Sequence, residues 1–165
     1  MINISTRIAA LATTALLAAT GAVVGAPQSS ASPRIPTCHV ADLHLSVGKS
    51  TGGAGSLFYP LRFTNTSTHT CSLRGYPGVS ILDSRRHQIG APAIRNAHPV
   101  STVFVHPART VFATIRTNNP SVVPTCRPTS TYIRVYPPAS FQSVLIRYHL
   151  KVCGAFEINP VQRTA

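Results

Sequence analysis

The sequence predicts an all-β fold, an immunoglobulin-like antiparallel β-sandwich of about eight strands that carries two disulfides. Of its 14 prolines, 13 lie after residue 31. Proline removes a backbone donor and clashes with the preceding helical turn, so helices are disfavoured along most of the chain. The windows between prolines alternate apolar and polar residues with a period of two, as half-buried strands do. Turn-forming clusters separate these windows, which is typical of a sandwich.

The first expected strand, residues 43–47, places Leu43, Leu45 and Val47 on one face. The second, residues 57–63, alternates in the same way but contains Pro60. Because proline cannot donate to a ladder, this segment is expected to be an edge strand or to carry a bulge. The other six strands are expected at residues 79–82, 102–105, 111–116, 132–136, 144–148 and 155–161.

Turn chemistry separates the expected strands, with Gly, Pro, Asn and Ser concentrated at residues 48–55, 65–70, 75–78, 84–88, 106–109 and 118–120. The chain contains no Trp, so the buried tryptophan of antibody-like domains is missing and the strand order stays open. A domain of this length buries about two thirds of its unfolded surface, which is enough for one independent core.

Residues 1–31 have the pattern of a secretory signal peptide, which leaves residues 32–165 as a secreted β-sandwich domain. Arg7 precedes an apolar run from Ile8 to Val24, and no acidic residue occurs before Asp42. A transmembrane anchor would need about 20 strongly apolar residues, whereas this run is rich in Ala and Thr. Cleavage after Ala26 or Ala31 suits the small-residue rule. Pro27 disfavours the first site, so Ala31 is the expected one.

All four cysteines lie in the exported part, where an even number indicates two disulfides. Three pairings are possible. Cys38 with Cys71 and Cys126 with Cys153 is the expected pairing, because each pair brackets adjacent β segments. Each bond would then contribute about 3 to 4 kcal/mol in the chain-entropy model. A zinc site is the alternative, but no two cysteines have the C-x-x-C spacing.

The order of segments resembles the actinobacterial secreted family called domain of unknown function 4232. The residues that carry the likeness are Cys38, Asp42-Leu43, 53–56, 61–67, 70–79, Asp83, 89–95, Cys126, 134–138 and Cys153. The segment Cys-x-Leu-x-Gly-Tyr-Pro-Gly at residues 71–78 is the most specific part. The resemblance implies a secreted or envelope-associated β-sandwich with two disulfides and no established enzyme activity. The sequence Arg85-Arg86-His87 after Asp83 departs from the family pattern and adds positive charge.

The Gly75-Tyr76-Pro77-Gly78 turn is expected to have a packing role rather than a ligand-binding one. Both glycines flank a proline turn in which a positive φ is expected, and Tyr76 can lay its ring over one end of the sandwich. Cys71 would hold this turn to the first strand.

The composition excludes several kinds of chemistry. The chain has 15 Lys and Arg against only 3 Asp and Glu, a formal charge of +12. Three acids leave little scope for a pair of catalytic carboxylates or a carboxylate-rich cage for Mg²⁺ or Ca²⁺. No G-x-S-x-G elbow is present, so a hydrolytic triad has no sequence support. No catalytic residue, cofactor or metal site is expected.

The seven histidines form no H-E-x-x-H or H-x-H motif, and most of them are expected to be solvated. They are His39, His44, His69, His87, His98, His106 and His149. A copper or zinc site assembled from distant strands stays open. The alternative function is therefore a small extracellular hydrolase or metal-dependent enzyme. It would need a pocket that gathers at least two histidines with Asp42, Asp83 or Glu157.

Arginine dominates the basic residues, and its planar fork pairs with carboxylate and phosphate better than lysine does. The expected function is a non-catalytic binding or cell-envelope structural module with an anionic ligand. Candidate partners are an anionic envelope glycan, a lipid head group or an acidic protein, whereas nucleic acid is disfavoured for an exported chain. The candidate anion-binding residues are Arg74, Arg85, Arg86 and Arg95. The competing explanation is that the charge only keeps a small domain soluble.

Overall fold

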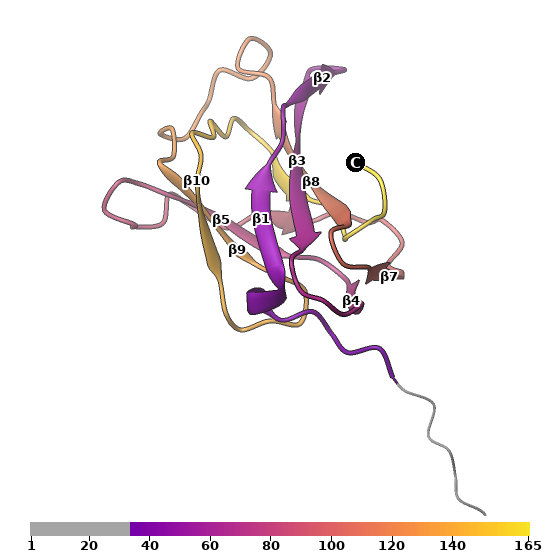
Figure 1. Cartoon of the computed structure of the whole chain (residues 1–165). Helices are drawn as coiled ribbons and strands as arrows, with labels where there is room; N and C mark the ends of the chain where they lie inside the picture. The colour runs from indigo at the N-terminus through magenta and orange to yellow at the C-terminus, as the bar shows by residue number, and fades with distance from the viewer. Residues whose placement is uncertain (1–33) are drawn as a thin grey trace, which may run out of the picture. The chain divides into compact units, whose positions relative to one another are not determined.

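The computed structural model describes residues 34–165 (Figure 1). The expected signal peptide and both of its cleavage sites lie outside the described residues. Within residues 34–165 the chain forms one short 3₁₀ turn, η1, and eleven strands. Their bounds are η1 Val40–Asp42, β1 Leu43–Val47, β2 Thr51–Gly53, β3 Ser56–Asn65, β4 Cys71–Arg74, β5 Gly78–Leu82, β6 Ile94–Arg95, β7 Thr102–Val105, β8 Thr110–Asn118, β9 Tyr132–Tyr136, β10 Val144–Arg147 and β11 Phe156–Ile158.

The fold is all-β, as predicted, and the order of six of its strands is that of an immunoglobulin-like sandwich. Within the described residues it differs from the prediction in having eleven strands in place of about eight and one parallel pair. One sheet contains β1, β3 and β8 side by side, and a second contains β10, β9 and β5 in that order (Figure 1). These groupings correspond to strands A, B and E and strands G, F and C of an immunoglobulin domain. The first sheet continues from β8 through β11 to β6, with β11 and β6 parallel. A small separate sheet pairs β4 with β7.

The hydrophobic core is formed by the inward-facing residues of both sheets, as the two-residue alternation predicts. The fully buried side chains of this cluster include Leu61 and Phe63 from β3, Ile115 from β8, Ile81 from β5 and Ile133 from β9. Full burial of one such side chain contributes about 1.5 to 3 kcal/mol. The residues between them point outward, and these outward positions carry the surface chemistry of the domain.

Pro60 lies inside a sheet, so the expectation that its strand forms an edge is wrong. β3 has β8 on one side, where Pro60 is in register with Thr114, and β1 and β2 on the other. On that second side the Pro60 carbonyl accepts the N–H of Gly48 at 2.8 Å. Val47 pairs with Leu61 and Thr51 pairs with Phe58, so the segment between Val47 and Thr51 is one residue longer than the segment of β3 opposite it. This extra residue is a bulge, and it lies in the chain that pairs with β3. The missing N–H of Pro60 faces this break.

Both expected disulfides are confirmed, Cys38 with Cys71 and Cys126 with Cys153. The first joins the segment before η1 to the start of β4, and both of its cysteines are buried. The second joins the connection between β8 and β9 to the segment before β11, and Cys126 is only half-buried. The two bonds therefore differ in their access to solvent.

The two glycines of the Gly-Tyr-Pro-Gly turn have different roles. Gly75 has a φ of +103°, as expected. Gly78 does not have a positive φ, so the expectation is wrong at that position. A side chain at position 78 is instead limited by the close approach of Tyr136, because a Cβ at Gly78 would lie 3.4 Å from the Cβ of Tyr136. Tyr76 has the expected packing role, since its hydroxyl donates to the backbone carbonyls of Asn96 and His98.

Replacing Gly75 with Ala is expected to lower the free energy of unfolding by about 1 to 2 kcal/mol, because an L side chain is strained at that φ. A Cβ at Gly75 would meet nothing within 4 Å, so the loss isolates the backbone effect. Urea denaturation measures it, with Gly53→Ala in β2 as the control. Gly53 has no positive φ, and its Cβ would meet only Phe58 at 3.9 Å. Equal losses in both variants would contradict this explanation.

Candidate functional site

Positive charge on the domain is almost entirely unpaired. Residues 34–165 contain 14 of the 15 Lys and Arg, since Arg7 lies outside them, and all three acidic residues. Among these described residues, only Arg116 has a carboxylate partner within 4.0 Å, Glu157, at 3.0 Å. The other thirteen cations have no acidic side chain to neutralise them. At these thirteen residues an anionic ligand would therefore not have to displace an internal carboxylate.

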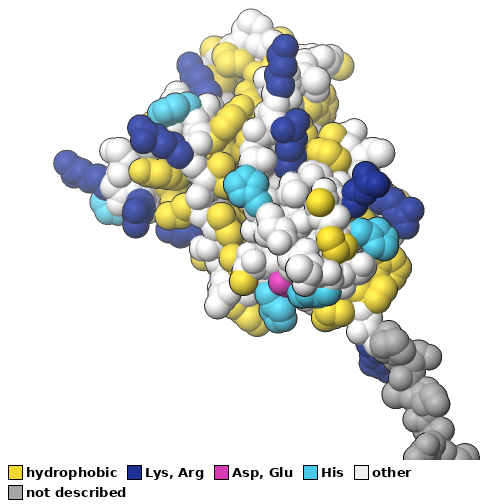
Figure 2. Space-filling view, in the orientation of Figure 1, with side chains coloured by type: hydrophobic (Ala, Val, Ile, Leu, Met, Phe, Trp, Pro, Cys, Tyr) yellow, Lys and Arg dark blue, Asp and Glu magenta, His cyan; other side chains and the backbone are white. Residues whose placement is uncertain are grey.

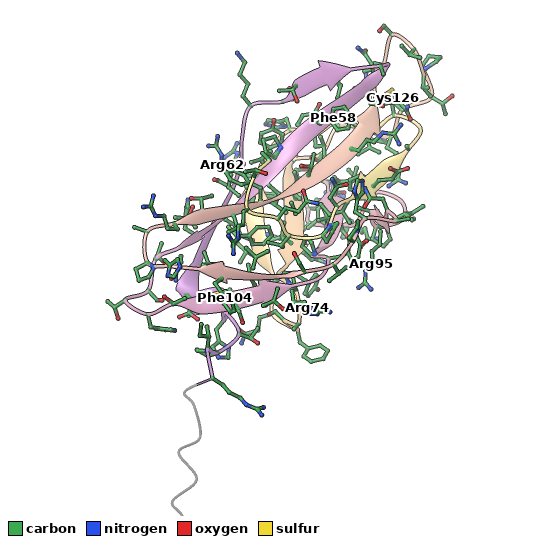
Figure 3. All side chains as sticks on the ribbon, turned by 90° about the vertical axis from the view of Figure 1, so that its right-hand side faces the viewer. Phe58, Arg62, Arg74, Arg95, Phe104 and Cys126 are labelled. Atoms are coloured by element: carbon green, nitrogen blue, oxygen red, sulfur yellow. A yellow bond between two sulfur atoms is a disulfide. The ribbon has the colours of Figure 1, made fainter. Side chains whose placement is uncertain are left out.

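Two of the arginines singled out from the sequence, Arg74 and Arg95, lie close to Tyr76. The Arg95 guanidinium is 5.8 Å from the centroid of the Tyr76 ring. Arg74, at the end of β4, donates to the Thr102 hydroxyl at 3.3 Å. Figure 3 shows Arg74 and Arg95 in the same part of the molecule, with Arg62 on the other side of this view. Both guanidiniums are exposed.

The other two, Arg85 and Arg86, lie on the exposed hairpin turn that follows β5. One carboxylate oxygen of Asp83 accepts the backbone N–H groups of Arg85 and His87, each at 2.8 Å, and this organises the turn. Arg74 and Arg95 lie near the Gly78 end of β5, while this turn follows the Leu82 end. A five-residue strand spans roughly 13 Å between its end residues, so the structure does not bring the four arginines together.

The histidines do not gather as the enzyme alternative requires. His69 is 3.8 Å from a carboxylate oxygen of Asp42, and His87 is 3.5 Å from one of Asp83. The other oxygen of Asp42 accepts the backbone N–H of His39 at 2.8 Å, so each aspartate has one imidazole ring within 4.0 Å, and Glu157 pairs with Arg116. Within residues 34–165, no three His, Cys, Asp or Glu side chains are close enough to share a metal ion.

A pocket of about 270 Å³ gathers two arginines that the sequence analysis did not single out. Its lining consists of Phe104, His106, Arg109, Thr110, Val111 and Arg163. We call it the arginine pocket. It forms where the end of β7, the start of β8 and the C-terminal segment meet. Figure 2 shows Lys or Arg side chains beside a His on the right-hand side of the molecule, the side on which Figure 1 places β7.

Buried Asn65 positions one wall of the arginine pocket, the turn 106–109. Its backbone N–H donates to the Arg109 carbonyl at 2.9 Å, and its own carbonyl accepts the N–H of Ala108 at 2.9 Å. The side-chain amide of Asn65 donates to the carbonyls of His69 and Val105, both at 2.8 Å. Asn65 is fully buried, so it fixes the turn from inside the fold.

The opposite wall comes from the C-terminal segment. Gln162 exchanges two backbone hydrogen bonds with Phe112, at 2.9 and 2.7 Å, and Val161 donates to the Gly75 carbonyl at 2.9 Å. These bonds hold the residue that follows, Arg163, beside the start of β8. The position of Arg163 is therefore set by backbone pairing rather than by its own side chain.

The chemistry of the arginine pocket suits an anionic group. No carboxylate lines it, while Arg109 and Arg163 do. Two guanidinium forks can each give a bidentate, charge-assisted pair of hydrogen bonds to a phosphate or carboxylate. The Nδ1 atom of His106 is 3.0 Å from the Thr70 hydroxyl, which restrains the imidazole ring. Phe104, 44% exposed, adds an apolar wall.

Larger hollows on the domain lack this charge. One of about 430 Å³ lies between residues 37–40 and 139–142, and one of about 620 Å³ lies between residues 64–68 and 107–108. Neither has Lys or Arg in its lining. A choice by volume would favour these two hollows, whereas a choice by the positive charge of the lining favours the arginine pocket.

Sequence reasoning missed Arg109 and Arg163 because no local pattern connects them. Arg109 and His106 belong to a segment that the sequence identifies as a turn, and this was the only signal available. Arg163 comes from the far end of the chain and reaches the pocket only through the pairing of Gln162 with Phe112.

Three further observations bear on the identity of the chain. No helix in residues 34–165 is long and apolar enough to cross a membrane. None of the curated proteins matches the sequence. The sequence model of the family described as "Domain of unknown function (DUF4232)" matches residues 38–162, which include all four cysteines and both walls of the arginine pocket up to Gln162. The chain therefore belongs to the DUF4232 family.

Proposed function

We propose that this domain is a non-catalytic binding module that holds an anionic group in the arginine pocket. The observation that carries the proposal is the convergence of Arg109 and Arg163, from segments far apart in the sequence, on one pocket without a carboxylate in its lining. Bringing two like charges together costs free energy unless a counter-charge joins them. A bound anion would supply that counter-charge.

The excess of unpaired cations supports the same proposal. It would draw an anionic partner toward the domain from a distance and raise the rate of association. The competing explanation, that positive charge serves solubility alone, requires no particular residues. The two explanations therefore differ in whether the loss of two specific charges matters more than the loss of any other two.

We further propose that the domain acts outside the cytosol, as a secreted or envelope-associated protein. The N-terminal segment has the pattern of a signal peptide, and two disulfides favour an oxidising compartment. The likeness to an actinobacterial secreted family points to the same place. The group bound there would be a phosphate or carboxylate of an envelope glycan, a lipid head group or an acidic protein.

Isothermal titration calorimetry of the oxidised protein with inorganic phosphate tests the pocket. Arg109→Gln/Arg163→Gln is expected to weaken phosphate binding at least tenfold, the equivalent of about 1.4 kcal/mol. Its thermal unfolding should change little, because exposed charges contribute little to folding. Added salt should weaken binding by the parent protein, since exposed charges are screened.

The matched control is Arg85→Ser/Arg86→Ser, which removes the same charge from the hairpin turn after β5. This variant should bind phosphate as the parent does. If both variants lose affinity equally, general electrostatics explains the binding. If only the hairpin variant loses it, the site lies at Arg85 and Arg86 and not in the arginine pocket.

A further inference from the structure

The outward face of the sheet β10-β9-β5 alternates aromatic and cationic side chains on its central strand. In β9, Ile133 and Val135 are fully buried, whereas Tyr132, Arg134 and Tyr136 are half-buried and lie on the opposite face. Residues two apart on a strand are separated by about 7 Å, so the three side chains form an evenly spaced row. We call the outward surface of this sheet the Tyr–Arg face.

The neighbouring strand β5 leaves room beside Tyr136, at its Gly78 end, whereas Leu82, opposite Tyr132, is a fully buried side chain. Gly78 is in register with Tyr136, and Ser80 with Arg134. Where a Cβ of Gly78 would be, the Cδ2 atom of Tyr136 is only 3.5 Å away and its Cγ atom 3.8 Å. The Tyr136 ring therefore leans over the Gly78 backbone. Such a ring can pack one face on the sheet and offer the other to a ligand.

The strand on the other side adds a second cation and an apolar side chain. Arg147 of β10 is in register with Tyr132, and Leu145 with Arg134. Leu145 is 38% exposed, and Arg147 is exposed. Within residues 34–165, neither Arg134 nor Arg147 has a carboxylate within 4.0 Å. This face therefore combines flat aromatic surface with unneutralised guanidiniums.

The hairpin turn after β5 extends the positive charge beyond the sheet. Leu82 is in register with Tyr132, so Arg85 and Arg86 lie past that end of the Tyr–Arg face. Asp83 is the one carboxylate on this turn, and its oxygens face the backbone N–H groups of Arg85 and His87 and the His87 ring. Figure 2 shows Lys, Arg and His side chains along the left-hand side, where Figure 1 places β10 and this hairpin.

We propose that the Tyr–Arg face binds an extended anionic glycan, with sugar rings stacked on Tyr132 and Tyr136 and acidic groups paired with Arg134 and Arg147. A sugar ring presents a C–H face that suits an aromatic ring, and a carboxylate or phosphate on the sugar suits a guanidinium fork. Single-stranded nucleic acid also stacks on aromatic side chains. Two disulfides favour a compartment in which acidic glycans are the common polyanions. This surface is separate from the arginine pocket and does not depend on it.

Fluorescence anisotropy with a labelled oligogalacturonate, a linear sugar chain with carboxylates along its length, tests the proposal on the oxidised protein. At physiological ionic strength, Arg134→Gln/Arg147→Gln and Tyr136→Leu are each expected to weaken binding about tenfold, the equivalent of about 1.4 kcal/mol. A labelled maltodextrin, which has the sugar faces without the charge, should bind far more weakly. The unfolding midpoint of every variant is measured alongside, and Tyr132→Leu serves as the aromatic test if Tyr136→Leu is misfolded.

The matched control is Lys49→Gln/Arg62→Gln, which removes the same charge from β3 and the connection between β1 and β2, on the other sheet. This control should keep the parent affinity for oligogalacturonate, and Arg109→Gln/Arg163→Gln should keep it while losing phosphate. Equal losses in the control and in Arg134→Gln/Arg147→Gln would overturn the proposal. So would parental binding by both tyrosine variants, or tighter binding of an oligothymidylate, which would assign this face to single-stranded nucleic acid.

Discussion

Reduction of both disulfides is expected to unfold the domain at 37 °C. The two bonds close loops with sequence separations of 33 and 27 residues. In the chain-entropy model each loop contributes about 3.5 kcal/mol, so the two together contribute about 7 kcal/mol. The whole stability of a domain is about 5 to 15 kcal/mol, and loss of both bonds removes much of it. Circular dichroism and urea denaturation with and without reductant measure the effect.

The order in which the bonds open provides an internal check. Cys126 is half-buried, whereas both Cys38 and Cys71 are buried. A thiolate must reach a sulfur atom to exchange with it, so mild reduction of the folded protein should open Cys126–Cys153 first. Alkylation followed by peptide mapping identifies the first free thiols. Earlier release of Cys38 and Cys71, or an unchanged unfolding curve after full reduction, would contradict the role given to the disulfides.

Replacing Asn65 with Ala is expected to lower the free energy of unfolding by about 3 to 5 kcal/mol. The variant removes the amide donor of the buried Val105 carbonyl and one of two donors to the His69 carbonyl, which keeps the Ser67 hydroxyl at 3.1 Å. An unsatisfied buried group costs about 1 to 3 kcal/mol. It also removes the acceptor of the Ser67 N–H and opens a small cavity at a fully buried position. Urea denaturation measures the loss.

Asn119→Ala is the matched control for Asn65→Ala. Asn119 accepts the N–H and the hydroxyl of Ser121 in a similar local turn, but these bonds are exposed to solvent. The control should lose about 1 kcal/mol or less, because water replaces the lost partner. Asn65→Ala should also weaken phosphate binding, since the turn that carries Arg109 rests on it. Equal destabilisation of the two variants would show that burial at Asn65 does not matter.

The alternation of apolar residues was sufficient to predict the core strands, and the even number of cysteines with the β segments they bracket predicted the disulfides. Leu61 and Phe63, for example, are fully buried as their spacing requires. The expectation for Pro60 was wrong because the edge rule assumes an unbroken neighbouring strand. The strands β2 and β6 were missed because three and two residues are too few to show a period. β4 was missed as well, although it is as long as β7. Their pairing is decided by neighbours that are distant in the sequence.

The sequence suggested an anionic ligand, which stays a prediction, but it did not indicate which residues the fold brings together. The excess of arginine favoured an anionic ligand. Arg74 and Arg95 were grouped with Arg85 and Arg86 because they are close in sequence, but the two pairs are far apart in the fold. A β-sandwich places successive turns at opposite ends, so neighbours in sequence become distant in space. Arg109 and Arg163 meet because β8 pairs with the C-terminal segment, a contact that no local pattern encodes.

A phosphate titration, followed through the Nε–Hε NMR signals of the arginine side chains, tests most directly whether the arginine pocket is a specific anion site. We expect the signals of Arg109 and Arg163 to shift saturably with a common dissociation constant, while those of Arg85 and Arg86 stay nearly unchanged. Arg163→Gln should abolish saturation at Arg109. Unsaturated shifts of similar size at all exposed arginines, or unshifted signals at Arg109 and Arg163, would contradict a specific site in this pocket.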